Sequence, residues 1–273
     1  MHLLTPRDYE RITPLLARRE IESHMALVYA VIEGTLPGKV FVDDPRAPRS
    51  LLVANLTGFW FAFGEPTETF FDFIPELLNV HLNDEPTALF ATSRAWETAL
   101  DRRFAHKFAR TGFHFAPQPG APPPNLAARL PSALRLVPLD PTLAARLGAD
   151  GMDPWIVRIW GGPAAFGERV FGWAVVDGER LLSFCTACGR GGGEAEIEIG
   201  TARTFEGRGL ATVVGAAFIT EALERGLTPA WTCDTRNIGS LAVARKLGFV
   251  ASETVAGYAL QKPPTVGFAA KAE

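Results

Sequence analysis

A glycine-bearing turn, Phe205-Glu206-Gly207-Arg208-Gly209, carries the clearest chemical signal in this sequence. It follows an alternating segment, residues 195–201, that is typical of a β-strand, and it leads into a long helical pattern, residues 210–225. Glycines let the backbone approach a ligand closely, and the first N–H groups of a helix have no acceptor within it. A strand, a glycine turn and a helix in this order are therefore suited to holding the pyrophosphate of a nucleotide-like cofactor.

The other reactive residue types do not form a recognisable site. Cys185 and Cys188 have the spacing of a redox or zinc motif, but they lie at the end of a predicted strand and no second pair follows. The 5 histidines are scattered, so no metal site is expected, and the 3 cysteines do not make a disulfide framework.

Composition excludes several classes of partner. Apolar residues make up 47% of the 273 residues and charged residues 21%, as in a globular protein with a sizeable core. The formal net charge of −3 gives no support for a nucleic-acid or anionic-membrane partner. No apolar run approaches the roughly 18 residues of a membrane span, and the first residues do not form a signal peptide. We therefore expect a cytoplasmic protein.

Proline density suggests where the chain divides. Proline at the density found in residues 117–131 prevents regular structure, which favours an extended linker. We expect an N-terminal α/β domain over residues 1–116 and a second domain over residues 132–273. A long internal loop within one domain is the alternative. In the first domain, helices are expected over 7–17, 21–32, 70–82 and 94–104, and strands over 39–42, 50–55, 58–63, 87–92 and 106–115.

The second domain should begin with a strand over 133–139 and two short helices. Asp177-Gly178 predicts a hairpin, and residues 189–193 predict a flexible turn. The two strands of this hairpin, expected over 170–176 and 180–186, form a meander together with residues 194–201, and this meander ends at the glycine turn. Asn237 is expected to cap a last helix over 238–247. The remaining expected strands cover 229–233 and 250–260.

This order of elements resembles the GNAT family of acyl-CoA-dependent N-acetyltransferases. The family's turn motif, Arg/Gln-x-x-Gly-x-Gly/Ala, reads here Glu206-Gly207-Arg208-Gly209-Leu210-Ala211. Its second signature, an Asn followed by a helix that ends in Leu-Gly-Phe, is present as Asn237, Ser240 and Leu247-Gly248-Phe249. The resemblance is specific over residues 171–249 and loose before residue 134. It implies an α/β (α+β) fold with a mixed, mostly antiparallel sheet flanked by helices.

Short stretches of the sequence indicate one branch of this family. The stretches EIEIGT, GRGLAT and KLGF look like the branch that includes zwittermicin-type self-resistance acetyltransferases. In that branch a catalytic domain follows an N-terminal domain with a related but degenerate fold. The resemblance implies acetyl-CoA as cofactor and a small-molecule amine as acceptor, and it is compatible with a homodimer.

Family roles can be carried over residue by residue. The strand end should offer backbone groups to the pantetheine arm of CoA, and the N–H groups of the turn should hold its pyrophosphate, assisted by the helix dipole. Asn237 and Ser240 should approach the thiol end, which makes Asn237 a catalytic candidate, although a plain helix cap is the alternative. The residues of the strand end are Ile199, Gly200 and Thr201, and those of the turn are Gly207, Arg208, Gly209, Leu210 and Ala211.

Two positions depart from the family. Glu206 stands where Arg or Gln is usual, so its carboxylate should point away from the pyrophosphate, and Arg208 is a candidate for the missing positive charge. Ala244 stands where a Tyr often protonates the leaving thiolate. Tyr258, Cys233 and Ser240 are the substitutes considered, beside unassisted departure of the thiolate.

Amine acetylation also needs a group that removes a proton from the amine. Glu196 and Glu198 lie on one face of the predicted strand, and we favour Glu198 as the general base. An exposed strand carboxylate is the alternative. N–H groups beside Ile199 can stabilise the developing negative charge.

Two other functions are alternatives. A protein that binds acyl-CoA without catalysis would explain Glu206 and Ala244 as signs of decay. A nicotinamide-binding Rossmann protein fits poorly because the turn lacks G-x-G-x-x-G and follows a hairpin.

Overall fold

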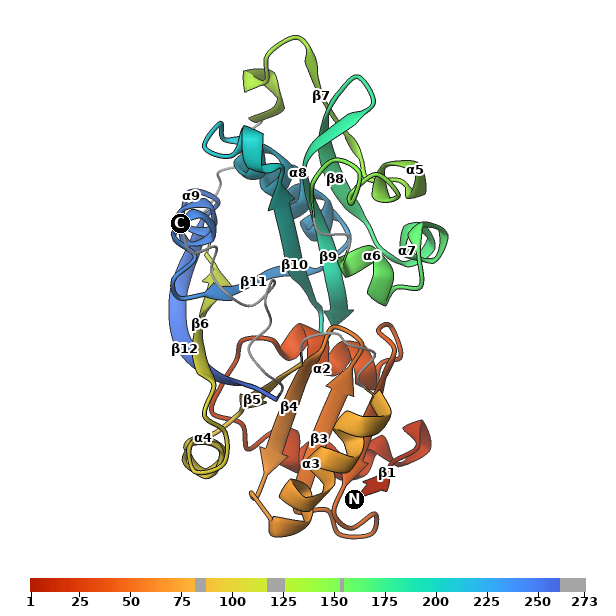
Figure 1. Ribbon diagram of the computed structural model, residues 1–273, viewed down its shortest axis with the longest axis vertical. Coiled ribbons are helices and arrows are strands. Elements are labelled where there is room, and N and C mark those ends of the chain that lie inside the picture. Colours follow the sequence, from red (N-terminus) through yellow and green to blue (C-terminus); the bar gives the residue numbers. More distant parts are fainter. Residues whose placement is uncertain (82–86, 117–125, 153–154, 261–273) are drawn as a thin grey trace.

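The computed structural model describes residues 1–81, 87–116, 126–152 and 155–260, and these form one mixed sheet flanked by helices (Figure 1). Within the described residues the sheet has 12 strands, and only the β4–β5 and β10–β11 pairs are parallel. The expected α/β fold with a mostly antiparallel sheet is therefore confirmed. None of the described helices is both long and apolar enough to span a membrane.

The strands lie close to the segments that the sequence predicts, except for the short N-terminal strand His2–Leu3, which the sequence does not predict. They are β1 (His2–Leu3), β2 (Gly38–Val42), β3 (Ser50–Asn55), β4 (Phe59–Gly64), β5 (Ala88–Ala91), β6 (Lys107–Phe115), β7 (Leu134–Pro138), β8 (Gly172–Asp177), β9 (Arg180–Gly191), β10 (Glu194–Thr201), β11 (Thr228–Asp234) and β12 (Phe249–Ala259).

The helices include short 3-10 turns, labelled η. They are η1 (Pro6–Ile12), α1 (Thr13–Leu16), α2 (Met25–Ile32), α3 (Glu68–His81), α4 (Arg94–Asp101), η2 (Leu126–Arg129), α5 (Pro141–Ala144), α6 (Trp155–Ile159), α7 (Pro163–Arg169), η3 (Arg203–Phe205), α8 (Leu210–Glu224) and α9 (Ile238–Lys246). Most of the predicted linker, residues 117–125, lies outside the described residues.

The two halves of the chain exchange strands. The order along the sheet is β1-β2-β3-β4-β5-β12-β6-β11-β10-β9-β8-β7. The last strand, β12, thus lies between β5 and β6, and β6 lies between β12 and β11, as Figure 1 shows near the middle of the molecule. Each half has the same succession: antiparallel strands, one parallel step, and then an antiparallel strand supplied by the other half.

The prediction of a flexible turn over residues 189–193 is wrong for residues 189–191, which belong to a strand. Gly189 and Gly191 belong to β9, and only Gly192 and Gly193 form the turn. The physical reason is close packing of α2 against β9. A Cβ atom at Gly189 would lie 2.6 Å from Cδ2 of Leu27, and one at Gly191 would overlap the backbone of α2.

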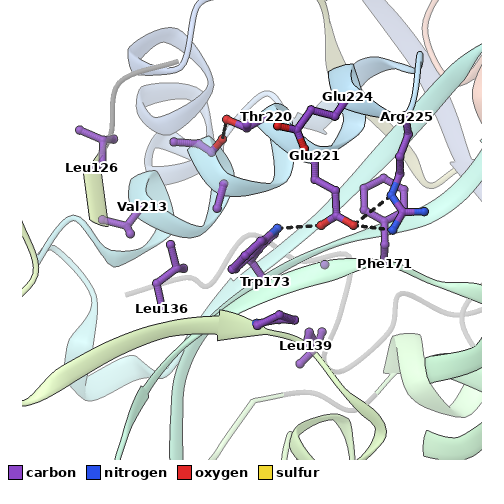
Figure 2. Close-up of a pocket in the computed structure, with 14 residues that line it drawn as sticks. Leu126, Leu136, Leu139, Phe171, Trp173, Val213, Thr220, Glu221, Glu224 and Arg225 are labelled. Carbon is purple, nitrogen blue, oxygen red and sulfur yellow. Dashed lines mark hydrogen bonds and ion pairs between the residues drawn. The ribbon is translucent and has the colours of Figure 1, made fainter. Parts of the chain in front are cut away.

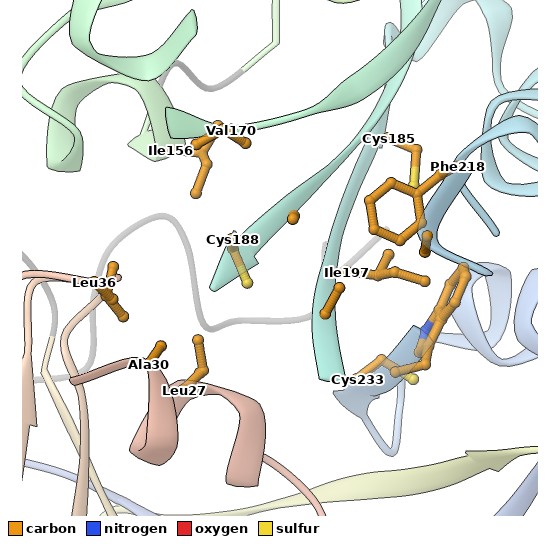
Figure 3. Packing of buried hydrophobic residues seen from close by; sticks show 14 of the residues in the cluster. Leu27, Ala30, Leu36, Ile156, Val170, Cys185, Cys188, Ile197, Phe218 and Cys233 are labelled. Atoms are coloured by element: carbon orange, nitrogen blue, oxygen red, sulfur yellow. The ribbon is translucent and has the colours of Figure 1, made fainter. Parts of the chain in front are cut away.

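The core therefore runs across both halves. Leu27 and Ala30 of α2 pack in one buried cluster with Cys188 of β9 and Ile197 of β10 (Figure 3). A second cluster, which includes Tyr258 of β12, fills the space around α3 and α4. The first half of the chain thus covers one face of the strands that lead to the glycine turn.

Candidate active site

Strands β10 and β11 diverge after a short parallel ladder. They pair only from Glu194 to Glu196, opposite residues 228–230, and then separate (Figure 1). β10 keeps its pairing with β9 as far as Thr201. Among the residues that the structure describes, the edge of residues 197–201 that faces β11 therefore has no strand partner, and its backbone groups can pair with an extended ligand. In the first half of the chain, β4 pairs with β5 along all four residues of β5.

The strand end is held rigidly from the β9 side. The Ser183 hydroxyl donates to the Gly200 carbonyl at 2.9 Å and lies 2.9 Å from the Thr201 hydroxyl. A Cβ at Gly200 would lie 2.6 Å from the Phe184 ring, so glycine permits this approach. Ile199, Gly200 and Thr201 are half-buried, beside the unpaired edge.

The glycine turn leaves an open row of donors at the start of α8. Gly207 and Gly209 have φ angles of 76° and 81°, and Gly209 is the N-cap of the 15-residue helix. Within the described part of the chain, the N–H groups of residues 207–211 have no acceptor. An added Cβ at either glycine would meet nothing within 4 Å. Exposed donors at a helix N-terminus are the geometry that binds a phosphate.

Two charged side chains, Glu206 and Arg208, flank these donors. Glu206 is exposed, as its unfavourable charge requires. The Arg208 guanidinium folds back, donates to the Thr204 carbonyl at 3.2 Å and lies over the Phe205 ring.

Asn237 and Ser240 lie at the first turn of α9. The Asn237 side chain accepts from the Ser240 N–H at 3.0 Å, so Asn237 is the helix cap that the sequence predicts. The Ser240 hydroxyl accepts from the Trp231 indole at 3.0 Å, which leaves its proton available to a further acceptor. Ala244 is buried and has no polar atom in its side chain.

The three substitutes for the missing Tyr are not equivalent. The Tyr258 hydroxyl donates to Asp101 at 2.7 Å on α4, in the second core cluster, so Tyr258 is unsuitable as a proton donor to the thiolate. Cys233 is buried on β11, and burial raises the pKa of its thiol. Ser240 hydrogen bonds to Cys233, which opposes that rise. Ser240 and Cys233, which hydrogen bond to each other, therefore remain as the candidate substitutes for the missing Tyr.

A buried polar cluster lies where β10 and β11 begin to separate. Glu196 is only 3% exposed and accepts from the Thr232 hydroxyl at 2.7 Å. His24, the residue before α2, places Nδ1 3.2 Å from that hydroxyl and 3.7 Å from the Glu196 carboxylate. Arg110 of β6 donates to the Thr232 carbonyl at 3.0 Å. Two of these four residues come from the first half of the chain.

Burial dominates the electrostatics of this cluster. It raises the pKa of Glu196 to about 7, against the lowering effects of the Thr232 hydrogen bond and the Arg110 charge. It also lowers the pKa of His24 well below its usual value, with the Arg110 charge adding to the effect, so His24 is neutral. Glu196 Oε2 and His24 Nε2 have no partner among the described residues.

Glu196 and Glu198 of β10 therefore differ. Glu196 is enclosed at the closed end of the divergence, whereas Glu198 is half-buried two residues further along, where the strands have separated. The sequence predicts the pair on one face but not this difference. It also missed His24 and Arg110, because nothing local marks them. His24 is the only non-glycine residue with positive φ in the described chain, and that strain is invisible in the sequence.

A separate groove of about 640 Å³ lies between α8 and strands β7 and β8 (Figure 2). Three of its polar side chains are paired with one another: the Trp173 indole donates to Glu221 at 2.8 Å, and Arg225 donates to the same carboxylate at 2.9 Å. None of the predicted site residues lines it.

Comparison with known proteins agrees with this geometry. A model of the GNAT acetyltransferase family matches residues 18–258. The uncharacterized N-acetyltransferase YdfB of Bacillus subtilis is 29% identical over 238 residues, covering 85% of this chain and 88% of that protein.

Solved structures share the fold at low identity. A GCN5-related N-acetyltransferase-like protein from Streptococcus suis has a TM-score of 0.71 at 21% identity, covering 93% of this chain and 98% of that one. A tandem GNAT protein from the clavulanic acid biosynthesis pathway has a TM-score of 0.59 at 13% identity, covering 96% of each chain. Since the family model spans both halves, this chain is an acetyltransferase that belongs to the GNAT family.

Proposed function

We propose that the protein transfers an acetyl group from acetyl-CoA to the amino group of a small molecule. The observation that carries this proposal is the divergence of β10 from β11 towards the open glycine turn. The unpaired edge of residues 197–201 suits an amide-containing arm, and the donors of residues 207–211 suit a pyrophosphate. The residues present therefore fit CoA, with Asn237 and Ser240 near its thiol end.

Acetyl-CoA, when bound, supplies the acetyl group, and the amine displaces CoA directly. Glu198 removes the proton of the attacking amine, since it is the β10 carboxylate that lies beyond the paired segment. N–H groups beside Ile199 stabilise the negative charge that develops on the carbonyl oxygen. Ser240 donates a hydrogen bond to the departing thiolate in place of its hydrogen bond to Cys233, because its hydroxyl accepts from Trp231 and keeps its own proton to donate.

The two halves of the chain have different roles. Residues 132–273 form the acetyltransferase domain, residues 117–131 link it to the rest, and residues 1–116 are a degenerate copy of the same fold. In that copy β4 pairs with β5 along the whole of β5, and the connection from β4 to α3, Glu65-Pro66-Thr67, contains no glycine. Within the family, the stretches EIEIGT, GRGLAT and KLGF favour the zwittermicin-type self-resistance branch.

The second candidate is a protein that binds acyl-CoA without catalysis. Ala244, which is buried and cannot donate a proton, favours it. An acetyltransferase releases the free thiol of CoA from acetyl-CoA when an amine is present, whereas a protein that only binds acyl-CoA does not. With a broad panel of primary amines, we expect thiol release that depends on both the protein and an amine. CoA binding by calorimetry without thiol release for any amine would favour the second candidate, and absence of CoA binding would contradict both.

A further inference from the structure

Two arginines from different elements share one aromatic ring beside the glycine turn. The Arg180 guanidinium, at the start of β9, lies 5.0 Å from the centre of the Phe205 ring. The Arg208 guanidinium, within the turn, lies 4.8 Å from the same ring. The Ala202 N–H donates to the Leu182 carbonyl at 2.8 Å, which ties the start of β9 to the segment that carries Phe205.

These two cations are uncompensated. Neither Arg180 nor Arg208 forms an ion pair with any residue that the structure describes. Three of the four other cations over aromatic rings in the described residues have carboxylate partners: Arg103 over Phe71 with Glu68, Lys107 over Tyr258 with Asp101, and Arg225 over Phe171 with Glu221. The fourth, the buried Arg110 over Phe59, hydrogen bonds to Thr232 instead.

Both side chains are exposed, so water screens the repulsion between the two like charges, and a bound anion would reduce it further. Arg208 lies within the glycine turn, whose donors already suit a pyrophosphate, and the shared Phe205 ring places Arg180 beside it. CoA carries one phosphate more than its pyrophosphate, on the 3′ oxygen of its ribose. Guanidinium groups match phosphate oxygens with two parallel hydrogen bonds.

We propose that Arg180 and Arg208 bind the 3′-phosphate of CoA, so that the protein distinguishes CoA from dephospho-CoA. This inference rests on the proposed function, because it assumes that CoA binds at the turn. The Phe205 ring holds both guanidinium groups in place. The Arg208 group is fixed further by the Thr204 carbonyl, which uses one of its five N–H donors and leaves the others for the phosphate.

The test is calorimetric titration of CoA and of dephospho-CoA, which lacks only the 3′-phosphate. A hydrogen bond to a charged group contributes enough to change affinity roughly tenfold or more, so we expect dephospho-CoA to bind at least about tenfold more weakly. In Arg180→Ala and in Arg208→Ala this ratio should fall at least about threefold, because CoA binding weakens while dephospho-CoA binding changes little. Circular dichroism establishes that each variant is folded.

Arg225→Ala is the matched control. Arg225 also lies over a phenylalanine, at 4.5 Å from the Phe171 ring, but it is paired with Glu221 at the far end of α8. Its removal should leave the affinity ratio unchanged. Equal affinity of the wild-type protein for the two ligands would overturn this inference while leaving the proposed function intact, as would an unchanged ratio in both folded arginine variants. Binding of neither ligand would overturn both proposals.

Discussion

Replacement of Glu196 by glutamine should change how the stability of the protein depends on pH. The pKa of Glu196 is raised from 4.5 to about 7 by burial. The folded state therefore holds a proton on this group over a pH range in which the unfolded state has released it. The contribution of Glu196 to stability is most favourable below pH 4.5 and is lost as pH rises through 7.

The size of the effect follows from the shift. One pKa unit corresponds to about 1.4 kcal/mol, and the two pKa values give a loss of roughly 2 to 3 kcal/mol between pH 5 and pH 8. Glutamine cannot ionise, keeps the shape of the side chain and keeps an oxygen that accepts from the Thr232 hydroxyl. The wild-type protein should therefore lose roughly 2 to 3 kcal/mol more than Glu196→Gln on going from pH 5 to pH 8.

Urea denaturation at the two pH values, followed by circular dichroism, measures this difference. Glu224→Gln is the control, because it removes an exposed carboxylate of α8 and should leave the wild-type pH dependence unchanged. Parallel pH profiles for the wild-type protein and Glu196→Gln would refute the assignment of a buried carboxylate that is neutral at mildly acidic pH.

Three further results are expected. Glu198→Gln should lower kcat more than the affinity for CoA, and unchanged turnover would leave Glu198 as a surface carboxylate. Tyr258→Phe should keep kcat while lowering the free energy of unfolding by about 1 kcal/mol, because the hydroxyl and its hydrogen bonds to Asp101 and the Glu97 carbonyl are lost; a large loss of kcat would restore Tyr258 as the proton donor. A fragment of residues 126–273 should not unfold cooperatively, because β6 is missing between β11 and β12; a sharp transition would show that the exchanged strand is dispensable.

Local features of the fold were predictable from the sequence. The strand, turn and helix around Gly207 and Gly209 are contiguous, and their pattern depends on neighbouring residues alone. The cap at Asn237 follows from the same short-range chemistry, and the structure confirms it.

Features that join distant residues were not predictable. The contact between His24 and Thr232 spans 208 positions, and no local pattern marks either residue. Gly189 and Gly191 read as a turn because glycine serves both for turns and for close approach, and only the position of α2 decides between them. The exchange of β6 and β12 is a choice of strand order, which alternating patterns within each strand do not specify.

Calorimetric titration of CoA into Gly209→Asp and Gly209→Asn tests the pyrophosphate assignment most directly. Asp and Asn have similar size, both tolerate the left-handed conformation of Gly209, and an added Cβ meets nothing within 4 Å, so the two variants differ mainly in charge. The carboxylate at the phosphate position should abolish CoA binding, whereas the amide should retain most of it. Equal CoA affinity in the Asp variant and the wild-type protein would contradict the placement of the pyrophosphate at this turn.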